Sequence, residues 1–330
     1  MHVLIAYEGI IPVVKYGGIQ RVIWYLGQEL INLGHRVTFL AGKGSSCPFA
    51  EMIVLDREKT VASQIPDYID VAHISYFRNE NLGEIKIPYI CMVQVNFYDD
   101  RKLDYNTVFV SKNHANRYGS DVFVYNGMDW EDYGTVKLDN WRSYFHFLAN
   151  AAWSIKNVRG AIKIIKKTPH ETLRVMGGTR LNFNMGFRFT LSPRIRFHGM
   201  VGGDLKNSLI QGSKGLLLPV KWHEPFGIAL TESLYFGCPV FGTPYGSQTE
   251  LITKEFGFLS NKTSELSEAI QNAEDYSPKR CHEYARDQFN SKVMARNYLD
   301  IYERVMNGQV LNENRPTLID ISEDRKLPWF

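Results

Sequence analysis

Apolar positions along the first forty residues follow two different periods. Residues 2–7 form a continuous apolar run, as expected for a parallel strand buried on both faces. Residues 19–33 carry apolar side chains at helical spacing, and Gly34 follows where helices commonly end. Residues 35–40 have the pattern of a second strand. This order of strand, helix and strand predicts a βαβ unit with a right-handed parallel crossover.

Further apolar segments predict a second α/β half after a break. In the first half, strands are expected at 71–76, 88–95, 107–111 and 122–126. Residues 127–142 are acidic and aromatic without a period, which is typical of a linker between domains. In the second half, strands are expected at 143–149, 172–178, 195–199 and 214–220, and helices at 156–167, 225–236, 264–274 and 279–307. The chain is therefore predicted to be an α/β protein with two Rossmann-like domains facing a central cleft.

Composition excludes several classes of protein. At 330 residues the chain has room for about two domains. Apolar residues make up 44% and charged residues 22%, which excludes wholesale disorder and a disulfide-stapled miniprotein. With 38 basic and 35 acidic residues the net charge is +3, so no nucleic-acid partner is expected.

Cysteine placement and the N-terminal segment predict a cytoplasmic protein. The four cysteines have no zinc-binding or disulfide-like spacing, and reduced thiols are expected. The first residues lack a basic segment, and Glu8 interrupts their apolar run, so no signal peptide is expected. No apolar stretch reaches the roughly 18 residues that cross a bilayer. Membrane contact is expected to be at most peripheral.

Candidate chemistry is concentrated after the strand that ends near residue 220. Glu224 precedes Pro225, and proline suits the first helical position. Phe226, Gly227 and Ile228 are then predicted to form the first turn of a helix. Amides at such a turn lack intrahelical partners and attract phosphates or hydroxyls.

A second glutamate lies on the same predicted helix. Glu232 follows Glu224 by eight residues, about two helical turns. Carboxylates accept hydrogen bonds from paired hydroxyls, which sugars and riboses offer. The plainer alternatives are a helix N-terminal charge for Glu224 and a solvated helix face for Glu232.

The pattern E-P-F-G-x-x-x-x-E followed by G-x-P-V resembles the donor-site signature of the family-4 retaining glycosyltransferases. Other matching segments are Gly17–Gly18, Asp70–His73, Val110–Ser111, Tyr125–Asp129 and Phe289–Tyr302. The resemblance covers nearly the whole chain and implies the GT-B fold. It implies an N-terminal acceptor domain over 1–138 and a donor domain over 139–305. The tail, 306–330, is expected to lean back on the N-terminal domain.

The resemblance also implies roles for individual residues. Glu224 would hold the transferred sugar, Glu232 the ribose, and Lys156 the diphosphate. The donor-binding residues that it implies are Gly17, Gly18, Lys156, Phe226, Gly227, Ile228, Glu232 and Met200. The co-substrate would be a nucleoside diphosphate sugar, with no other cofactor and no metal ion. The chain has no D-x-D motif, which metal-dependent transferases of the other major fold use.

Two positions depart from the family pattern. Ala151 stands where the family has an arginine, and Gln94 stands where members often have a histidine near the reacting sugar. Gln94 is grouped with Glu224 as a catalytic candidate because its amide can still donate a hydrogen bond. The expected activity is hexosyl transfer, with retention, to a saccharide, lipid-linked or small-molecule acceptor in glycan or glycoconjugate biosynthesis. The alternatives are a sugar-nucleotide epimerase and a non-catalytic nucleotide-sugar-binding subunit.

A basic region accompanies these motifs. Residues 151–198 hold ten Lys or Arg and one acid, Glu171. Such a field could attract an anionic donor or anionic lipid, but a solvated helix-and-loop surface is the preferred explanation. Trp153 and Trp222 are candidates for stacking on a sugar or base, and core packing is the alternative.

Overall fold

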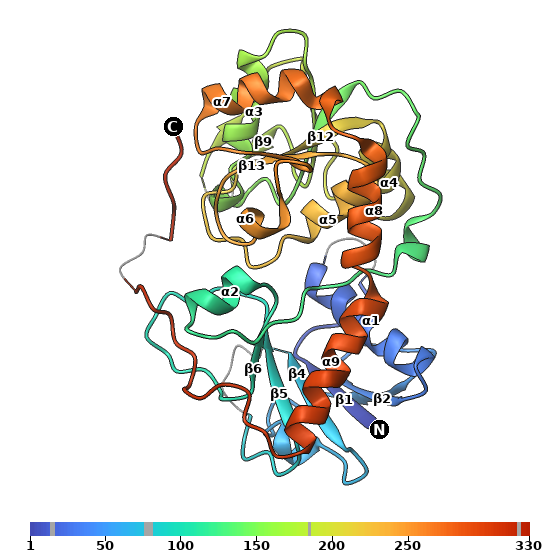
Figure 1. Ribbon diagram of the computed structural model, residues 1–330. Coiled ribbons are helices and arrows are strands. Elements are labelled where there is room, and N and C mark those ends of the chain that lie inside the picture. The colour runs from blue at the N-terminus through green and yellow to red at the C-terminus, as the bar shows by residue number, and fades with distance from the viewer. Residues whose placement is uncertain (14–16, 76–81, 184–185, 322–324) are drawn as a thin grey trace. The chain divides into compact units, whose positions relative to one another are not determined.

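The computed structural model describes residues 1–13, 17–75, 82–183, 186–321 and 325–330 (Figure 1). The described chain divides into two compact units. Unit 1 contains residues 1–13, 17–129 and 289–321, and unit 2 contains residues 130–288 and 325–330. Each unit is built on its own six-stranded parallel sheet.

Unit 1 has the strand order β3-β2-β1-β4-β5-β6. Its strands are β1 (His2–Tyr7), β2 (Arg36–Ala41), β3 (Glu51–Val54), β4 (Val71–Ser75), β5 (Tyr89–Val93) and β6 (Thr107–Phe109). Its helices are α1 (Gly18–Asn32), α2 (Lys112–Arg117), α9 (Ser291–Met306) and the short 3₁₀ turn η1 (Ala62–Gln64). Helices α1 and α9 lie side by side (Figure 1).

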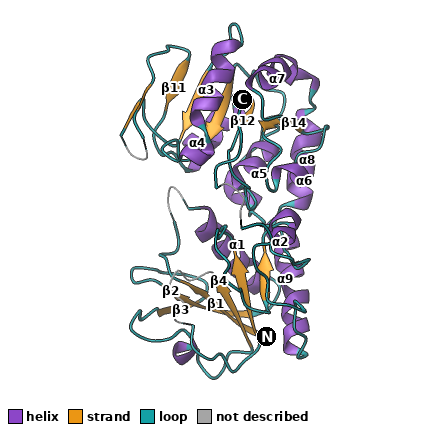
Figure 2. Cartoon of the chain, turned by 90° about the vertical axis from the view of Figure 1, so that its left-hand side faces the viewer, coloured by secondary structure: helices purple, strands orange, loops and turns teal. Residues whose placement is uncertain are grey.

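Unit 2 has the order β11-β8-β7-β12-β13-β14. Its strands are β7 (Tyr144–Leu148), β8 (Leu173–Met176), β11 (Ile195–Phe197), β12 (Ser213–Leu218), β13 (Val240–Gly242) and β14 (Gly257–Leu259), with a separate antiparallel pair, β9 (Leu181–Asn182) and β10 (Arg188–Phe189). Its α-helices are α3 (Val158–Lys167), α4 (Gly203–Gln211), α5 (Ile228–Tyr235), α6 (Gln248–Leu251), α7 (Thr263–Ala269) and α8 (Pro278–Gln288). Its 3₁₀ turns are η2 (Trp130–Tyr133), η3 (Ser154–Lys156) and η4 (Ile270–Asp275). Figure 2 shows β11 and β14 at opposite sides of this sheet.

Both sheets are wound outward from their first strand in two directions. In unit 1 the order reverses between β1 and β4, and in unit 2 between β7 and β12. Most side chains of the central strands β1, β4, β7 and β12 are buried, which explains their largely apolar sequence. In open parallel sheets, ligands bind beyond the carboxyl ends of the strands at such a reversal. A ligand site of unit 2 is therefore expected at the carboxyl ends of β7 and β12.

Most predicted strands and the first helix are confirmed, with shifts of one or two residues at their ends. Residue 76, the predicted end of the third strand, lies outside the described residues. The predicted strand at 122–126 is wrong, since only Phe123 bridges to Phe109. The predicted helix at 279–307 is two helices, because Asn290 adopts an extended conformation and its side chain caps α9 by accepting from the Val293 amide.

The division between the units differs from the predicted boundary at 138. Residues 130–138 group with unit 2, where Trp130 stacks on Tyr235 at 4.1 Å between ring centroids. Residues 289–305, predicted to be part of the donor domain, group with unit 1. There α9 packs against α1, and Tyr302 forms a 2.7 Å hydrogen bond with His73 of β4. The tail contributes to both units, through residues 306–321 and 325–330.

Two further findings concern the membrane and the thiols. Among the described residues, none of the helices combines the length and the apolar character needed to cross a bilayer.

All four cysteines are free thiols. Burial raises the pKa of the Cys238 thiol to about 11 and that of Cys281 to about 12, so both stay protonated at neutral pH.

Candidate functional site

The carboxyl ends of β7 and β12 bring two predicted residues into contact. Lys156 ends the short turn η3 after β7, and Glu224 lies in the loop after β12. The Lys156 Nζ donates to Glu224 Oε2 at 2.6 Å, and the side chains are 12% and 7% exposed. Trp222 Nε1 donates to the same oxygen at 3.0 Å, and its ring lies 4.7 Å from the Lys156 ammonium. The cluster thus presents a cation, a carboxylate and an aromatic face together.

Backbone contacts fix the loop that carries Glu224. The Ser247 amide donates to the Glu224 carbonyl at 2.9 Å, and the Ser247 hydroxyl donates to the Phe226 carbonyl at 2.7 Å. Gly246 has a φ of +63°, and a Cβ there would lie 2.2 Å from the Glu224 nitrogen. Only glycine allows this approach. The carboxylate is therefore held by a rigid backbone, as a positioned binding group requires.

The helix after Glu224 begins later than predicted. Helix α5 starts at Ile228, so Phe226 and Gly227 are not its first turn. Gly227 has a φ of +81°, a left-handed conformation that stops a helix from including the residues before it. Phe226 is 2% exposed, and its side chain belongs to the core. The free helical amides therefore begin at Ile228, and Gly227 lies beneath the Glu224 side chain, since a Cβ there would be 3.0 Å from Glu224 Cγ.

Glu232 belongs to a second, buried ion pair rather than to a solvated face. Its Oε1 accepts a 2.7 Å hydrogen bond from the Tyr133 hydroxyl and forms an ion pair with Lys206. The Glu232 and Lys206 side chains are almost fully buried. The Lys206 ammonium also lies 4.7 Å from the centre of the Tyr133 ring. Sequence reasoning missed both partners.

No local signal marks these two partners. Lys206 sits in α4 beside the exposed Leu205, so the apolar pattern would turn the leucine inward and the lysine outward. Tyr133 lies in the stretch whose sequence predicts a linker. Their contacts with Glu232 depend on how η2, α4 and α5 pack, which no short window of sequence contains.

Three predicted residues lie in unit 1. Gly17 and Gly18 stand at the start of α1, after β1, and residues 14–16 of that loop lie outside the described residues. Gln94 directly follows β5. Its Oε1 accepts a 3.4 Å hydrogen bond from the Asn126 amide nitrogen. All three residues follow strands of the unit 1 sheet, and their roles toward a donor stay predictions.

Ala151 and Met200 occupy different environments in unit 2. Ala151 is buried, and its amide donates to the Gly177 carbonyl at 2.7 Å. Its side chain faces Gly178, and it lines a pocket of about 270 Å3. Met200 lies exposed in the loop after β11. Trp153 also lines the pocket, whereas Trp222 belongs to the Lys156–Glu224 cluster.

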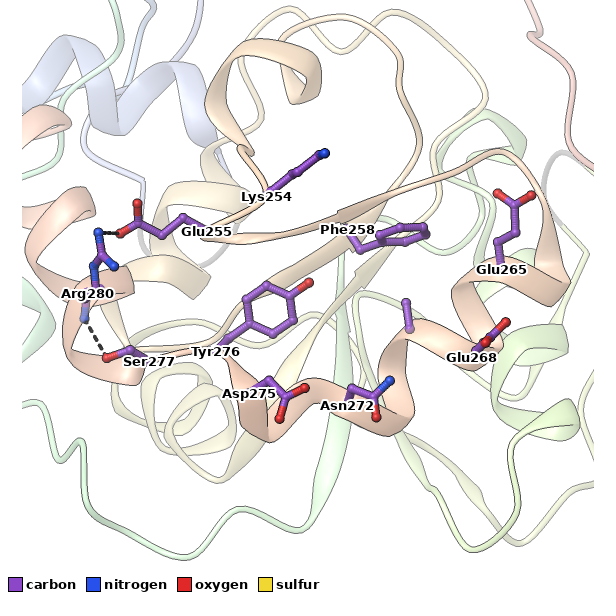
Figure 3. A pocket seen from close by; sticks show the side chains of 11 residues that line it. Lys254, Glu255, Phe258, Glu265, Glu268, Asn272, Asp275, Tyr276, Ser277 and Arg280 are labelled. Atoms are coloured by element: carbon purple, nitrogen blue, oxygen red, sulfur yellow. Dashed lines mark hydrogen bonds and ion pairs between the residues drawn. The ribbon is translucent and has the colours of Figure 1, made fainter.

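A larger hollow of unit 2 lies away from these residues. It measures about 860 Å3 and runs along the edge strand β14 and helices α7 and α8 (Figure 3). Its charges are mixed, and Arg280 forms an ion pair with Glu255 across one end. None of the predicted site residues lines it. The volume of a hollow therefore does not by itself show where the candidate site lies.

Comparisons with known proteins identify the relatives of this fold. Residues 144–288 match the sequence profile of the family described as "Glycosyl transferases group 1". A glycosyltransferase involved in avilamycin A biosynthesis is 17% identical over 93% of this chain and 98% of its own, with a TM-score of 0.72. Sucrose-phosphate synthase from Thermosynechococcus elongatus is 14% identical over 93% and 100%, with a TM-score of 0.73.

A third solved structure contains ligands. The Anabaena protein HepE, in complex with UDP and glucose, is 14% identical over 92% of this chain and 99% of its own, with a TM-score of 0.63. Among curated proteins, none matched the sequence. The fold class is thereby confirmed, with two parallel six-stranded sheets as in GT-B glycosyltransferases. The family-4 assignment and the roles of the two glutamates stay predictions.

Proposed function

We propose that the protein is a glycosyltransferase that moves a sugar from a nucleoside diphosphate sugar to a hydroxyl acceptor. The observation that carries the proposal is the buried Lys156–Glu224 pair at the carboxyl ends of β7 and β12. It lies at the strand reversal where doubly wound sheets bind nucleotides. The match of residues 144–288 to a glycosyltransferase family supports the same reading.

The pair suits a donor that carries both negative charge and hydroxyl groups. Without a donor, Lys156 and Glu224 neutralise each other at 2.6 Å. A bound nucleotide sugar would replace this contact on both sides, with its diphosphate at Lys156 and its sugar hydroxyls at Glu224. The anomeric carbon–oxygen bond then breaks with its electron pair going to the diphosphate, while the acceptor hydroxyl oxygen forms the new bond and passes its proton to the leaving diphosphate. Lys156 would stabilise the charge that develops on the leaving diphosphate.

Glu232 is proposed to hold the ribose, with Lys206 and Tyr133 as its positioning residues. The ion pair to Lys206 and the 2.7 Å bond from Tyr133 fix the direction of the carboxylate. A carboxylate held this way loses little side-chain entropy when it accepts further hydrogen bonds. Lys206 therefore acts through Glu232 in this proposal and does not touch the donor.

Unit 1 is proposed to supply the remaining contacts. The amides at Gly17 and Gly18, at the start of the fifteen-residue helix α1, would face the diphosphate. Gln94 would donate a hydrogen bond near the reacting sugar. Met200, in unit 2, would lie beside the base. Retention of configuration, hexosyl transfer and independence of metal ions belong to the same proposal, and a chelator should leave turnover unchanged.

A panel of nucleotide sugars, screened by thermal shift, first identifies the donor. The test of the site is then Lys156→Ala, with Lys262→Ala as a matched surface control. The expected result is that the nucleoside diphosphate binds more weakly to the Lys156 variant, while the nucleoside binds as before. Equal losses for both ligands, or an equal loss in the control, would contradict a diphosphate role for Lys156.

A non-catalytic nucleotide-sugar-binding subunit is the second candidate. The observation that favours it is Ala151, a buried methyl group where the resembled family has a guanidinium. Turnover of the identified donor, with and without acceptors, separates the candidates. Turnover that requires an acceptor supports a transferase, inversion at C2 supports an epimerase, and tight binding without turnover supports the subunit.

A further inference from the structure

Among the residues that the structure describes, the pocket of about 270 Å3 beside Ala151 is lined by four cations and by no acid. It is formed by the loop after β7, the start of α3, the β9–β10 pair, the loop after β12 and the C-terminal segment. The cations are Arg159, Arg188, Lys221 and Lys326, and the other described lining residues are uncharged. Lys156 and Glu224 do not line it. The pocket is thus separate from the cluster described above, although both use the carboxyl edge of the same sheet.

Among these cations, Arg188 is buried and has one guanidinium nitrogen without a hydrogen-bond partner among the described residues. Its side chain comes from β10, and the residue is only 5% exposed. One end of the guanidinium is occupied, since Nη2 donates to the Thr179 carbonyl at 3.0 Å and Cζ lies 4.7 Å from the Phe197 ring. Nη1 is buried and has no hydrogen-bond partner among the described residues. A buried guanidinium with an unmet donor is unfavourable unless an acceptor joins it.

The other cations reinforce one another. The Leu327 amide donates to the Lys221 carbonyl at 2.8 Å, which holds the backbone before Lys326 against the loop after β12. Burial and the charge of Lys326 lower the pKa of Lys221, and burial and Arg159 lower the pKa of Arg188. Within the ranges that the structure describes, none of the four cations forms an ion pair. An anion bound in the pocket would relieve their mutual repulsion.

The start of α3 adds to the positive field. Asn157 and Val158 line the pocket, and Asn157 caps the helix by accepting from the Gly160 amide at 3.0 Å. Helix α3 runs over ten residues, from Val158 to Lys167. The amides of its first turn and its dipole favour an anion at this end.

We propose that this pocket binds a phosphoryl group. Nη1 of Arg188 would donate to one of its oxygens, and Lys221 and Lys326 would neutralise its charge. The inference does not depend on sugar transfer. The phosphoryl group has two possible sources, the diphosphate of a donor or the phosphate of another small molecule. In the first case Arg188, from the β9–β10 pair, would replace the guanidinium that position 151 lacks.

The experiment measures pyrophosphate binding to the full chain by titration calorimetry at low salt. The double variant Lys221→Gln/Lys326→Gln changes two side chains outside the core and should bind pyrophosphate roughly tenfold more weakly or worse. Lys254→Gln/Lys262→Gln removes two charges elsewhere on unit 2 and should bind as the parent does. Arg188→Met should lose most of the binding if its thermal melt shows that it folds. Unchanged affinity in the first double variant, or an equal loss in the second, overturns the proposal.

A competition experiment between pyrophosphate and nucleoside diphosphate shows which molecule supplies the phosphoryl group. If the phosphoryl group is the donor's, pyrophosphate and the nucleoside diphosphate compete, and both bind more weakly to the first double variant. If it belongs to another molecule, pyrophosphate still binds a chain saturated with nucleoside diphosphate. If pyrophosphate binds as expected but no nucleotide sugar is turned over, the phosphoryl-binding proposal is supported and the glycosyltransferase proposal is contradicted. If a nucleotide sugar is turned over but the Lys221→Gln/Lys326→Gln variant binds pyrophosphate as the parent does, the glycosyltransferase proposal is supported and the phosphoryl-binding proposal is contradicted.

Discussion

At the scale of single residues, the Lys156–Glu224 ion pair leads to a prediction about how tightly a Glu224 variant binds nucleoside diphosphate. Glu224→Gln removes the charge that neutralises Lys156 but keeps a side chain that can hydrogen-bond Trp222. Nucleoside diphosphate should therefore bind at least as tightly as before. Transfer from the whole donor should fall, by about 10- to 150-fold for the loss of charge-assisted bonds worth roughly 1.5–3 kcal/mol. Calorimetry and initial rates measure the two effects, and an affinity loss as large as that of Lys156→Ala would contradict this division of roles.

Glu232 and Lys206 lead to a prediction about stability. Removing one partner of a buried ion pair leaves the other charge without compensation and costs about 3–5 kcal/mol. Glu232→Ala should therefore lower the urea midpoint sharply, whereas Glu232→Gln with Lys206→Met should recover much of the loss. If the single and double variants lose the same stability, the pair does not hold the fold in this way. In the folded double variant, an unchanged affinity for nucleoside diphosphate would also remove Glu232 from the ribose site.

At the scale of elements, the loop before α5 depends on close backbone contact at Gly246. Gly134 offers a matched control, because it also has a positive φ, +71°, but a methyl group added there would meet no atom within 4 Å. Ala at either site should cost roughly 1–2 kcal/mol for the left-handed backbone. Gly246→Ala should cost a further 1–3 kcal/mol, about the penalty of overpacking, since its methyl would press on Glu224. Urea titration of both variants gives the difference, and equal losses would show that the close approach is not required.

Elements were predictable from the sequence where burial is regular along the chain. β1, α1 and β2 follow that rule, because their apolar period directly reports which face is covered. The start of α5 was not predictable, since the rule for Pro225 cannot anticipate the left-handed Gly227. In the candidate site, the placement of Lys156 and Glu224 after strands of the second half was predictable from the family's sequence pattern. The burial of Lys206 was not, because its partners Glu232 and Tyr133 come from elements distant in sequence.

At the scale of the whole molecule, three buried histidines link stability to pH. Burial lowers the pKa of His73, His114 and His146 to about 3, with Arg117 adding to the effect at His114 and Arg142 at His146. Folding keeps these imidazoles neutral, whereas the unfolded chain takes up protons below about pH 6.5. Their contribution is complete above that pH and is lost progressively as the pH falls toward 3.

The two units should respond to acid unequally. At pH 5 each histidine should cost about 2 kcal/mol of stability relative to pH 7. His73 and His114 belong to unit 1 and His146 to unit 2, so the unfolding of unit 1 should shift further. Urea titrations at pH 7 and pH 5 can follow unit 1 through Trp24 fluorescence in a chain whose other tryptophans are replaced by phenylalanine. A Trp24→Phe chain reports on unit 2, which holds the other five tryptophans. His146→Gln should reduce the pH response of unit 2 and leave that of unit 1 unchanged. Equal shifts of both units in the parent chain would mean that groups other than these histidines set the acid limit.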